Sequence, residues 1–244
     1  MRTDTAAARG SAAVRRVLEA ELARARARGV NEPHVVDVGG GSGGWAVPFA
    51  SGGCRVTVVE PNPNALATLR RRADEVGVAE RITVVADDTD ALGRSVPAGS
   101  ADVVLAHGLL EVVDDPAAVI GSLAAVVAPG GAVSVLVANR HAAVLHRALA
   151  GRLDEARRLL TGPDGVLDED GDTLLRRFDA DGLVALLAGA GLEMASLQGD
   201  GVVADAVSGD AWSAELTDFE AAAATASPLR DIAARLHAVA HRPG

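Results

Sequence analysis

Several residue types are missing or scarce in this sequence. Lysine and tyrosine are absent from the 244 residues, so all 23 basic residues are arginine, and aromatic residues make up 2% of the chain. The single cysteine, Cys54, excludes an internal disulfide and any zinc site built from several cysteines. Because Cys54 directly precedes a predicted strand, we expect it to be a small core residue.

Long apolar runs are also missing. The longest candidate, residues 123–138, is interrupted by Pro129-Gly130-Gly131 and falls short of the roughly 20 residues that span a bilayer. Arginine and glutamate occupy the N-terminal region, where a signal peptide has its apolar stretch. We therefore expect a cytoplasmic protein with no membrane partner. The net charge of −10 argues against tight, non-specific binding to a phosphate backbone but leaves room for a local basic patch.

The order of predicted elements indicates an α/β fold. Short apolar segments alternate with segments of helical periodicity up to about residue 138. The expected strands are 34–38, 55–59, 82–85, 101–106 and 132–137, and the expected helices are 11–28, 64–76 and 116–127. Strands that alternate with helices in this way form a parallel sheet covered on both faces.

The pattern changes after Ala138. We expect a helix over 140–160, a polar loop over 161–172 and a helix over 181–190. Gly199-Asp200-Gly201 predicts a hairpin between strands 192–197 and 202–207. Two further helices, about 211–225 and 228–240, are expected to end the chain.

A glycine-rich turn follows directly on the first predicted strand. Its pattern is Asp37-x-Gly39-x-Gly41-x-Gly43, and glycine allows both positive φ and close approach of a ligand to the backbone. Glu60 ends the second strand, seventeen residues after Gly43, where a carboxylate can accept both ribose hydroxyls of a nucleoside. Asp37 would oppose an anionic pyrophosphate. It suits a cationic ligand, such as the sulfonium and amino group of S-adenosylmethionine.

With these features the chain resembles the class I S-adenosylmethionine-dependent methyltransferases. Four further segments are similar to motifs of that family: Val56–Asn64, Ile82–Asp90, Asp102–Glu111 and Ala128–Gly131. The resemblance implies a Rossmann-like fold, with a seven-stranded, mostly parallel sheet that ends in an antiparallel hairpin, and S-adenosylmethionine as cofactor. It implies cofactor binding by Asp37, Gly39, Gly41, Gly43, Glu60, Pro61, Asp88, Thr89 and His107. It also implies one domain over 1–244, in which the N-terminal helix 11–28 and the cofactor-binding core 30–138 are followed by an inserted acceptor-side segment 139–180 and by the hairpin and helices of 181–244.

Residues 107–116 and 138–151 resemble one subgroup, the tRNA 5-carboxymethoxyuridine methyltransferases, which esterify the carboxylate of a modified wobble uridine. This resemblance implies substrate binding by Asn139, Arg140, His141, His146 and Asp205. The chain departs from the subgroup at Gly201 and Ala204, which stand in place of an arginine and a histidine, and at Ala138, where an aromatic residue is expected. The first two departures remove contacts that an anionic acceptor would use.

Two other functions stay open. The first is a methyltransferase that acts on a small-molecule metabolite, and the second is a non-catalytic cofactor-binding module. Arginines 140, 147, 152, 157, 158, 176 and 177 gather in the predicted insertion. They form either a strip that contacts tRNA phosphates or a solvated helix face.

The expected chemistry needs few catalytic groups. Methyl transfer from a sulfonium is a direct displacement, so positioning supplies much of the rate. A carboxylate acceptor is ionised near neutral pH and needs no general base. A hydroxyl or amine acceptor would need one, and His107 and His141 are the first catalytic candidates. His141 and His146 lie five residues apart with no acidic residue to complete a ligand set, so no metal site is expected.

Overall fold

The computed structural model describes residues 12–163, 165–167, 176–203 and 214–244. Its centre is a seven-stranded sheet with the order β3-β2-β1-β4-β5-β7-β6. The strands are β1 His34–Val38, β2 Arg55–Val59, β3 Ile82–Val85, β4 Ala101–His107, β5 Val127–Ala138, β6 Glu193–Asp200 and β7 Arg235–His241. Only β7 runs antiparallel to its neighbours. The expected seven-stranded, mostly parallel sheet with an antiparallel C-terminal pair is therefore confirmed.

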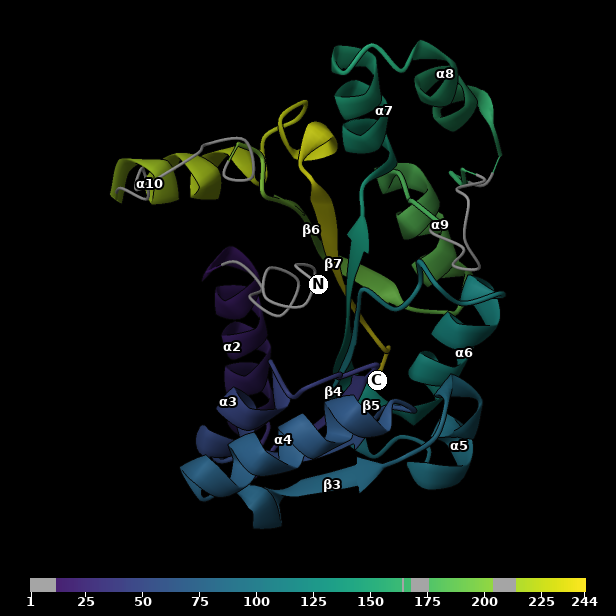
Figure 1. Cartoon of the computed structure of the whole chain (residues 1–244). Helices are drawn as coiled ribbons and strands as arrows, with labels where there is room; N and C mark the ends of the chain where they lie inside the picture. The colour runs from purple at the N-terminus through teal and green to yellow at the C-terminus, as the bar shows by residue number, and fades with distance from the viewer. Residues whose placement is uncertain (1–11, 164, 168–175, 204–213) are drawn as a thin grey trace.

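Helices cover both faces of the sheet (Figure 1). One face carries α2 Ala12–Ala27, α3 Ala46–Ser51 and α4 Pro63–Val76, and the other carries α5 Leu92–Ser95, α6 Pro116–Val126 and α9 Ala180–Gly189. Beyond the carboxyl end of β5 lie α7 Arg140–Leu149 and α8 Leu153–Thr161, and α10 spans Ala214–Ala223. Short 3₁₀ turns occupy Ala79–Arg81, Thr89–Ala91 and Arg230–Ile232.

The strands of the sheet centre are apolar throughout because both of their faces are buried. Val36 and Val104 pack into the core under α6 and α9, whereas Val35 and Val103 pack into the core under α2 and α3. Cys54 is buried in the second core. Both faces are covered, as a parallel sheet requires, so the ligand-binding features are confined to the ends of the strands.

Local sequence signals set where α4 and α6 begin and where α4 ends, close to the predicted positions. The Asn62 side chain accepts hydrogen bonds from the backbone N–H groups of Asn64 and Ala65, which caps the first turn of α4. Gly77 ends α4 with a φ of 74°. Asp115 caps α6 in the same way as Asn62 caps α4. The carboxyl ends of β2 and β4 are thereby followed by defined turns.

The expected single helix over 140–160 is wrong. The chain forms α7 and α8, and Gly151 between them has a φ of 75°, which a residue with a side chain rarely adopts. The break allows α8 to fold back beside α7 (Figure 1).

The expected hairpin around Gly199-Asp200-Gly201 is also wrong. The strand continues through Asp200 as β6, and its partner is β7 rather than residues 202–207. The backbone N–H groups of Val202 and Val203 donate to the Glu220 carboxylate at 2.9 and 2.7 Å, so the chain leaves the sheet there. Residues 204–207 lie outside the described part of the chain.

The expected helix over 228–240 is wrong for a different reason. Alanine favours helix locally, but residues 235–241 form β7 in the gap between β5 and β6. Leu236, Ala238 and Ala240 pack into the core under α6 and α9, and His237 and Val239 are buried on the opposite face. Burial on both faces therefore overrides the local preference. The helix expected over 211–225 is α10, whose described part begins at Ala214.

The described helices include none that is long and apolar enough to cross a membrane. Within the described ranges, His, Cys, Asp and Glu side chains form no cluster that would hold a metal ion.

Candidate functional site

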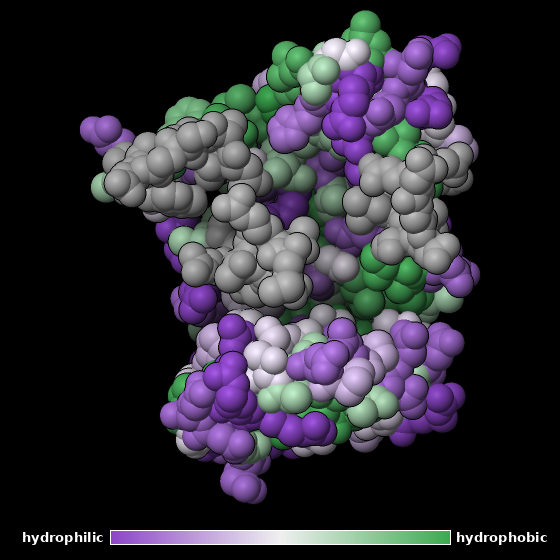
Figure 2. Space-filling view, viewed as in Figure 1, coloured by the Kyte–Doolittle hydropathy of each residue, from purple (hydrophilic) through white to green (hydrophobic). Residues whose placement is uncertain are grey.

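A cleft opens at the carboxyl ends of β1, β2 and β4 and extends to α6. Its volume is about 640 Å³. Five of its lining residues are ones that the sequence indicated: Gly39, Glu60, Pro61, Asp88 and Thr89. The space-filling view shows this face of the molecule hollowed between the α4 region below and the α7–α8 region above (Figure 2). The cleft lies where open α/β sheets bind ligands.

The glycine-rich turn brings backbone to the floor of this region. Gly39, Gly41 and Gly43 have φ angles of 72°, 54° and 79°. A Cβ atom on Gly40 would lie 2.6 Å from an oxygen of Asp37. The sequence after β1 therefore needs glycine both for its backbone angles and for close packing.

Asp37 is a buried carboxyl group at the end of β1. Its Oδ2 atom is buried and has no hydrogen-bond partner among the described residues. Burial, together with the nearby Glu60 carboxylate, raises the pKa of Asp37 to about 7. An unpartnered buried carboxyl group fits a ligand that brings positive charge, as the sulfonium and amino group of S-adenosylmethionine would.

Glu60 borders the cleft at the end of β2. Its two oxygens accept hydrogen bonds from the backbone N–H of Gly41 at 3.0 Å and from that of Asn62 at 2.8 Å. These bonds fix the carboxylate, and each oxygen retains a further lone pair for a ligand hydroxyl. This arrangement fits a ribose diol.

The far wall of the cleft combines polar and apolar groups. One oxygen of Asp88 accepts from the Thr89 backbone N–H at 2.6 Å and from the Thr89 hydroxyl at 3.1 Å. Val112 and Val113 also line the cleft. Polar groups together with apolar side chains fit an adenine ring. The lining residues thus fit the ribose and the adenine of S-adenosylmethionine, whereas Asp37, Gly41, Gly43 and His107, also predicted to bind the cofactor, are not among them.

His107 is the last residue of β4, and the next residue, Gly108, lines the cleft. Its ring contacts Trp45 edge to face, with centroids 5.5 Å apart, and its Nε2 atom lies 2.9 Å from the Ser134 hydroxyl oxygen. Burial, with His237 and Arg235 nearby, holds the pKa of His107 well below its usual range. The imidazole is therefore neutral at physiological pH. Its buried Nδ1 atom has no hydrogen-bond partner in the described ranges.

Asn139 lies at the carboxyl end of β5 as a structural cap. Its amide nitrogen donates to the carbonyls of Asp231 at 2.9 Å and Ala233 at 2.8 Å, and its oxygen accepts from the His141 backbone N–H at 3.0 Å. These bonds join the start of α7 to the segment before β7. The side chain is buried and its polar atoms are engaged with the protein.

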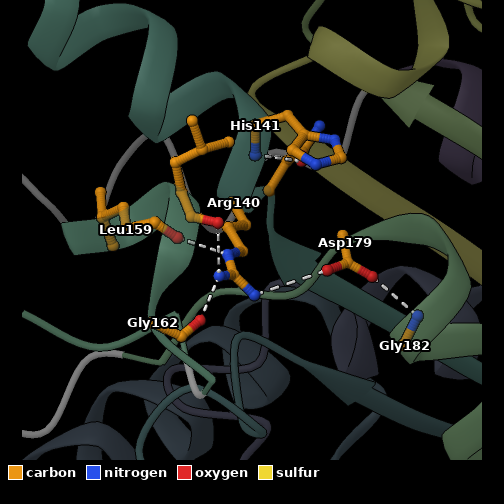
Figure 3. Close-up of polar contacts among 8 residues, drawn as sticks. Arg140, His141, Leu159, Gly162, Asp179 and Gly182 are labelled. Carbon is orange, nitrogen blue, oxygen red and sulfur yellow. Dashed lines mark hydrogen bonds and ion pairs between the residues drawn. The ribbon is translucent and has the colours of Figure 1, made fainter. Parts of the chain in front are cut away.

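Arg140 connects three elements of the predicted insertion (Figure 3). Its guanidinium donates to the carbonyl oxygens of Leu159 at 2.6 Å, Leu160 at 3.2 Å and also Gly162. It pairs with Asp179 at 3.7 Å, and Asp179 in turn caps α9. This geometry ties α7 to the end of α8 and to the start of α9, and uses Arg140 for folding.

The other acceptor-side candidates lie apart from one another. His141 and His146 are exposed on α7. Asp205 lies outside the described residues. The predicted arginine strip is largely engaged: Arg147 and Arg152 pair with Glu155 at 3.0 and 3.4 Å, and Arg176 donates to the Val113 carbonyl at 2.9 Å.

Sequence reasoning missed three charged residues that interact around the start of β7. Arg235 begins β7 and pairs with the buried Asp200 of β6 at 2.7 Å. Glu111 accepts a hydrogen bond from the Ala138 backbone N–H at 2.8 Å, and burial raises its pKa. The sequence predicted a helix at Arg235, so it did not bring these three residues together. The alternation of polar and apolar residues from Arg235 onward was the signal that could have indicated a strand.

Comparisons with known proteins agree with this geometry. The family model described as a methyltransferase domain matches residues 11–197. The chain is 30% identical over 128 residues to the tRNA 5-carboxymethoxyuridine methyltransferase of Escherichia coli K12, covering 52% of this chain and 48% of that protein. It is 36% identical over 126 residues to the ubiquinone biosynthesis O-methyltransferase of Pectobacterium carotovorum, covering 52% of each. The chain thus spans about half the length of these relatives.

Solved structures share the fold. A Methanosarcina mazei protein described as a SAM-dependent methyltransferase superposes with a TM-score of 0.61 at 16% identity, over 88% of this chain and 94% of that one. The Burkholderia thailandensis 1,6-didemethyltoxoflavin-N1-methyltransferase, solved with S-adenosylhomocysteine, superposes with a TM-score of 0.57 at 19% identity, over 96% of this chain and 79% of that one. The chain therefore belongs to the methyltransferase-domain family, and it shares its fold with S-adenosylmethionine-dependent methyltransferases.

Proposed function

We propose that this protein transfers the methyl group of S-adenosylmethionine to a carboxylate oxygen of its acceptor, and so forms a methyl ester. The observation that carries the proposal is the charge around His107. The cationic Arg235 acts on a histidine that is itself neutral. Asp200 balances the charge of Arg235, so Arg235 would bind an anionic acceptor through its unpartnered Nε–H group, and the neutral imidazole would offer that acceptor no strong base.

Arg235 has one side left for such a group. Asp200 pairs with its Nη2 atom, whereas its buried Nε atom has no hydrogen-bond partner within the described ranges. About a quarter of the side chain, 26%, is exposed. Charge-assisted bonds from a guanidinium fork to a carboxylate are among the strong hydrogen bonds in proteins. An acceptor carboxylate would share Arg235 with Asp200.

Bound S-adenosylmethionine supplies an electrophilic methyl group on a sulfonium. Asp37 would hold the cationic end of the cofactor and Glu60 the ribose. His107 and Arg235 would orient the acceptor oxygen on the side of the cleft away from Asp88. Since a carboxylate carries its own nucleophilic lone pair, this chain needs to position the group rather than remove a proton.

The first candidate for the molecule that bears the carboxylate is the modified wobble uridine of tRNA. The 30% identity to the Escherichia coli enzyme over 128 aligned residues supports this candidate. The second candidate is a small metabolite with a carboxylate. The engaged arginines support this one, because Arg140, Arg147, Arg152 and Arg176 all have partners within the protein and leave few cations for phosphates.

Transfer of labelled methyl from S-adenosylmethionine tests the proposal. Bulk tRNA and a small-molecule extract, each from a strain lacking this protein, are offered separately. Mild alkali removes a methyl ester and retains a ring, ribose or amine methyl. Alkali-labile label in either fraction is expected, and the fraction identifies the acceptor. Alkali-stable label alone would overturn the carboxylate assignment. No label in either fraction, with cofactor binding shown in the same preparation, would favour a non-catalytic binding module.

A variant at Arg235 sharpens the test. Arg235→Lys keeps the charge beside Asp200 but loses the planar fork, and we expect the acceptor KM to rise about tenfold with the Kd for S-adenosylmethionine unchanged. Arg70→Lys, on the exposed face of α4, is the matched control for exchanging an arginine for a lysine. An unchanged acceptor KM in Arg235→Lys would separate this residue from the acceptor.

A further inference from the structure

Four polar side chains form a continuous row across one face of the sheet. The Nε2 atom of His107 on β4 lies 2.9 Å from the Ser134 hydroxyl oxygen on β5. The same hydroxyl lies 2.8 Å from Nε2 of His237 on β7. The Nδ1 atom of His237 lies 3.0 Å from the amide nitrogen of Gln198 on β6. The row therefore crosses four adjacent strands and ends at His107.

The strand register explains why these residues meet. Leu136 of β5 is opposite His107 on one side and His237 on the other, and His237 is opposite Gln198. Ser134 precedes Leu136 by two residues, so its side chain points to the same face. Ser134 and His237 are fully buried, and Gln198 is 7% exposed. Water is thus largely excluded from the middle of the row.

The chemistry of each group determines which atom donates and which atom accepts at each hydrogen bond of the row. An amide nitrogen only donates, so Nδ1 of His237 accepts from Gln198. Burial lowers the pKa of His237 to about 4, and the neutral ring then carries its proton on Nε2, which donates to Ser134. The Ser134 hydroxyl in turn donates to Nε2 of His107. The remaining proton of His107 is therefore on Nδ1.

We propose that Gln198, His237 and Ser134 are positioning residues that hold His107 in the Nδ1–H tautomer, so that His107 offers the methyl acceptor a hydrogen-bond donor instead of a base. The Nδ1 atom is the buried ring nitrogen that has no partner among the described residues. Its N–H group can donate a hydrogen bond to an anionic oxygen. A hydroxyl acceptor would instead need an unprotonated ring nitrogen to take its proton. In this respect the inference rests on the proposed carboxylate acceptor, although the tautomer itself is a property of the protein alone.

Nitrogen-15 NMR of the S-adenosylmethionine-bound protein tests the tautomer without any acceptor. In the wild type, we expect His107 to show a protonated Nδ1 and an unprotonated Nε2. Ser134→Ala removes the donor to Nε2, so both tautomers of His107 should be populated. Because removing one oriented hydrogen bond affects an equilibrium or a barrier by about tenfold, the kcat for methyl transfer should fall by about that factor with the Kd for S-adenosylmethionine unchanged.

Two further variants separate positioning from folding. Ser134→Thr retains the hydroxyl and should keep the wild-type tautomer of His107. Gln198→Met, on the edge strand, removes the donor to Nδ1 of His237 and should weaken the preference of His107 for the Nδ1–H tautomer without a direct change at His107. Ser196→Ala is the matched control, since it removes a hydroxyl from β6 outside the row. An Nε2–H tautomer in the wild type would overturn the inference, as would identical spectra in wild type, Ser134→Ala and Gln198→Met. If the tautomer is as expected but the labelled product is alkali-stable, the acceptor assignment alone is lost.

Discussion

The two halves of the sheet are built in different ways. In the β3-β2-β1 half, the site comes from residues close in sequence to one another: residues 37–43, 60–62 and 87–89 each form a local turn after a strand. In the β5-β7-β6 half, the key contacts join distant residues. Ser134 and His237 are 103 residues apart, and Asn139 and Ala233 are 94 apart. The cofactor half can therefore be recognised from local spacing, and the acceptor half depends on topology.

The halves also differ in charge. Five acidic residues line the cleft of the cofactor half: Glu60, Asp88, Asp90, Asp114 and Asp115. The acceptor half places a neutral histidine beside the Arg235–Asp200 pair. The acidic residues of the cleft favour a cation, and on the other side of β4 the proposed carboxylate acceptor would share Arg235 with Asp200. The expected effects below follow this division.

The largest effect is expected at Glu60. Glu60→Ala removes a carboxylate that borders the cleft and would hold two ribose hydroxyls. Since a hydrogen bond to a charged group contributes about 1.5–3 kcal/mol, the Kd for S-adenosylmethionine should rise by about 100-fold. Calorimetry would measure it, with Glu75→Ala on the exposed end of α4 as the control. An unchanged Kd in a folded protein would remove Glu60 from the ribose site.

A glycine in the same half should matter for stability. The Cβ of Gly40→Ala would lie 2.6 Å from Asp37 Oδ2 and 2.9 Å from a methyl group of Val58. Overpacking of this kind lowers the free energy of unfolding by about 1–3 kcal/mol. Gly121→Ala in α6 meets no atom within 4 Å and should instead raise it slightly. Urea unfolding of both variants checks the contrast, and equal effects would contradict the close packing behind Asp37.

The two halves also differ in how far their amino-acid sequence predicts them. Gly39 and Glu60, which the sequence predicts to share one site, both line the cleft, because strand, turn and acid follow one another within about thirty residues. Asp37 is not among the lining residues, and the roles of all three toward the cofactor stay predictions. The register of β7 was not predictable in this way. Alanine favours helix locally, and only the gap between β5 and β6 makes a strand of the segment that holds Arg235 and His237. The cap role of Asn139 was hidden for the same reason, since its partners lie just before β7.

Asp37 should make cofactor binding depend on pH. Because its pKa is about 7 in the cofactor-free protein, Asp37 is largely protonated at pH 6 and ionised at pH 8. A cationic ligand needs the ionised form, so the affinity for S-adenosylmethionine should rise by about tenfold between pH 6 and pH 8. Asp37→Asn should bind more weakly and lose this slope. Glu60→Ala should shift the slope to lower pH, because the Glu60 charge contributes to the raised pKa.

The same carboxyl group gives a stability slope of opposite sign. The folded protein holds the Asp37 proton up to about pH 7, whereas an unfolded aspartate releases it near pH 4. Asp37 therefore stabilises the folded state most below about pH 4, and this contribution is lost as the pH rises toward 7. Denaturation of the cofactor-free protein at several pH values would measure the slope, and Asp37→Asn should flatten it. A slope that is unchanged in Asp37→Asn would assign it to other groups.

The smallest effect, on the acceptor KM, is expected to differ between two exposed histidines of α7. His141 is at the first turn of α7, directly after the carboxyl end of β5, and it acts electrostatically on Asp231 near the start of β7. His146 lies more than one helical turn further along α7. An exposed polar contact contributes up to about 1 kcal/mol, so His141→Ala should raise the acceptor KM about threefold. His146→Ala should leave it unchanged, and both variants should keep the wild-type free energy of unfolding within about 0.5 kcal/mol. Initial-rate kinetics with the identified acceptor would decide between them. Equal increases in KM would extend the acceptor surface along α7, whereas no increase in either would confine it to His107 and Arg235 at the ends of the strands.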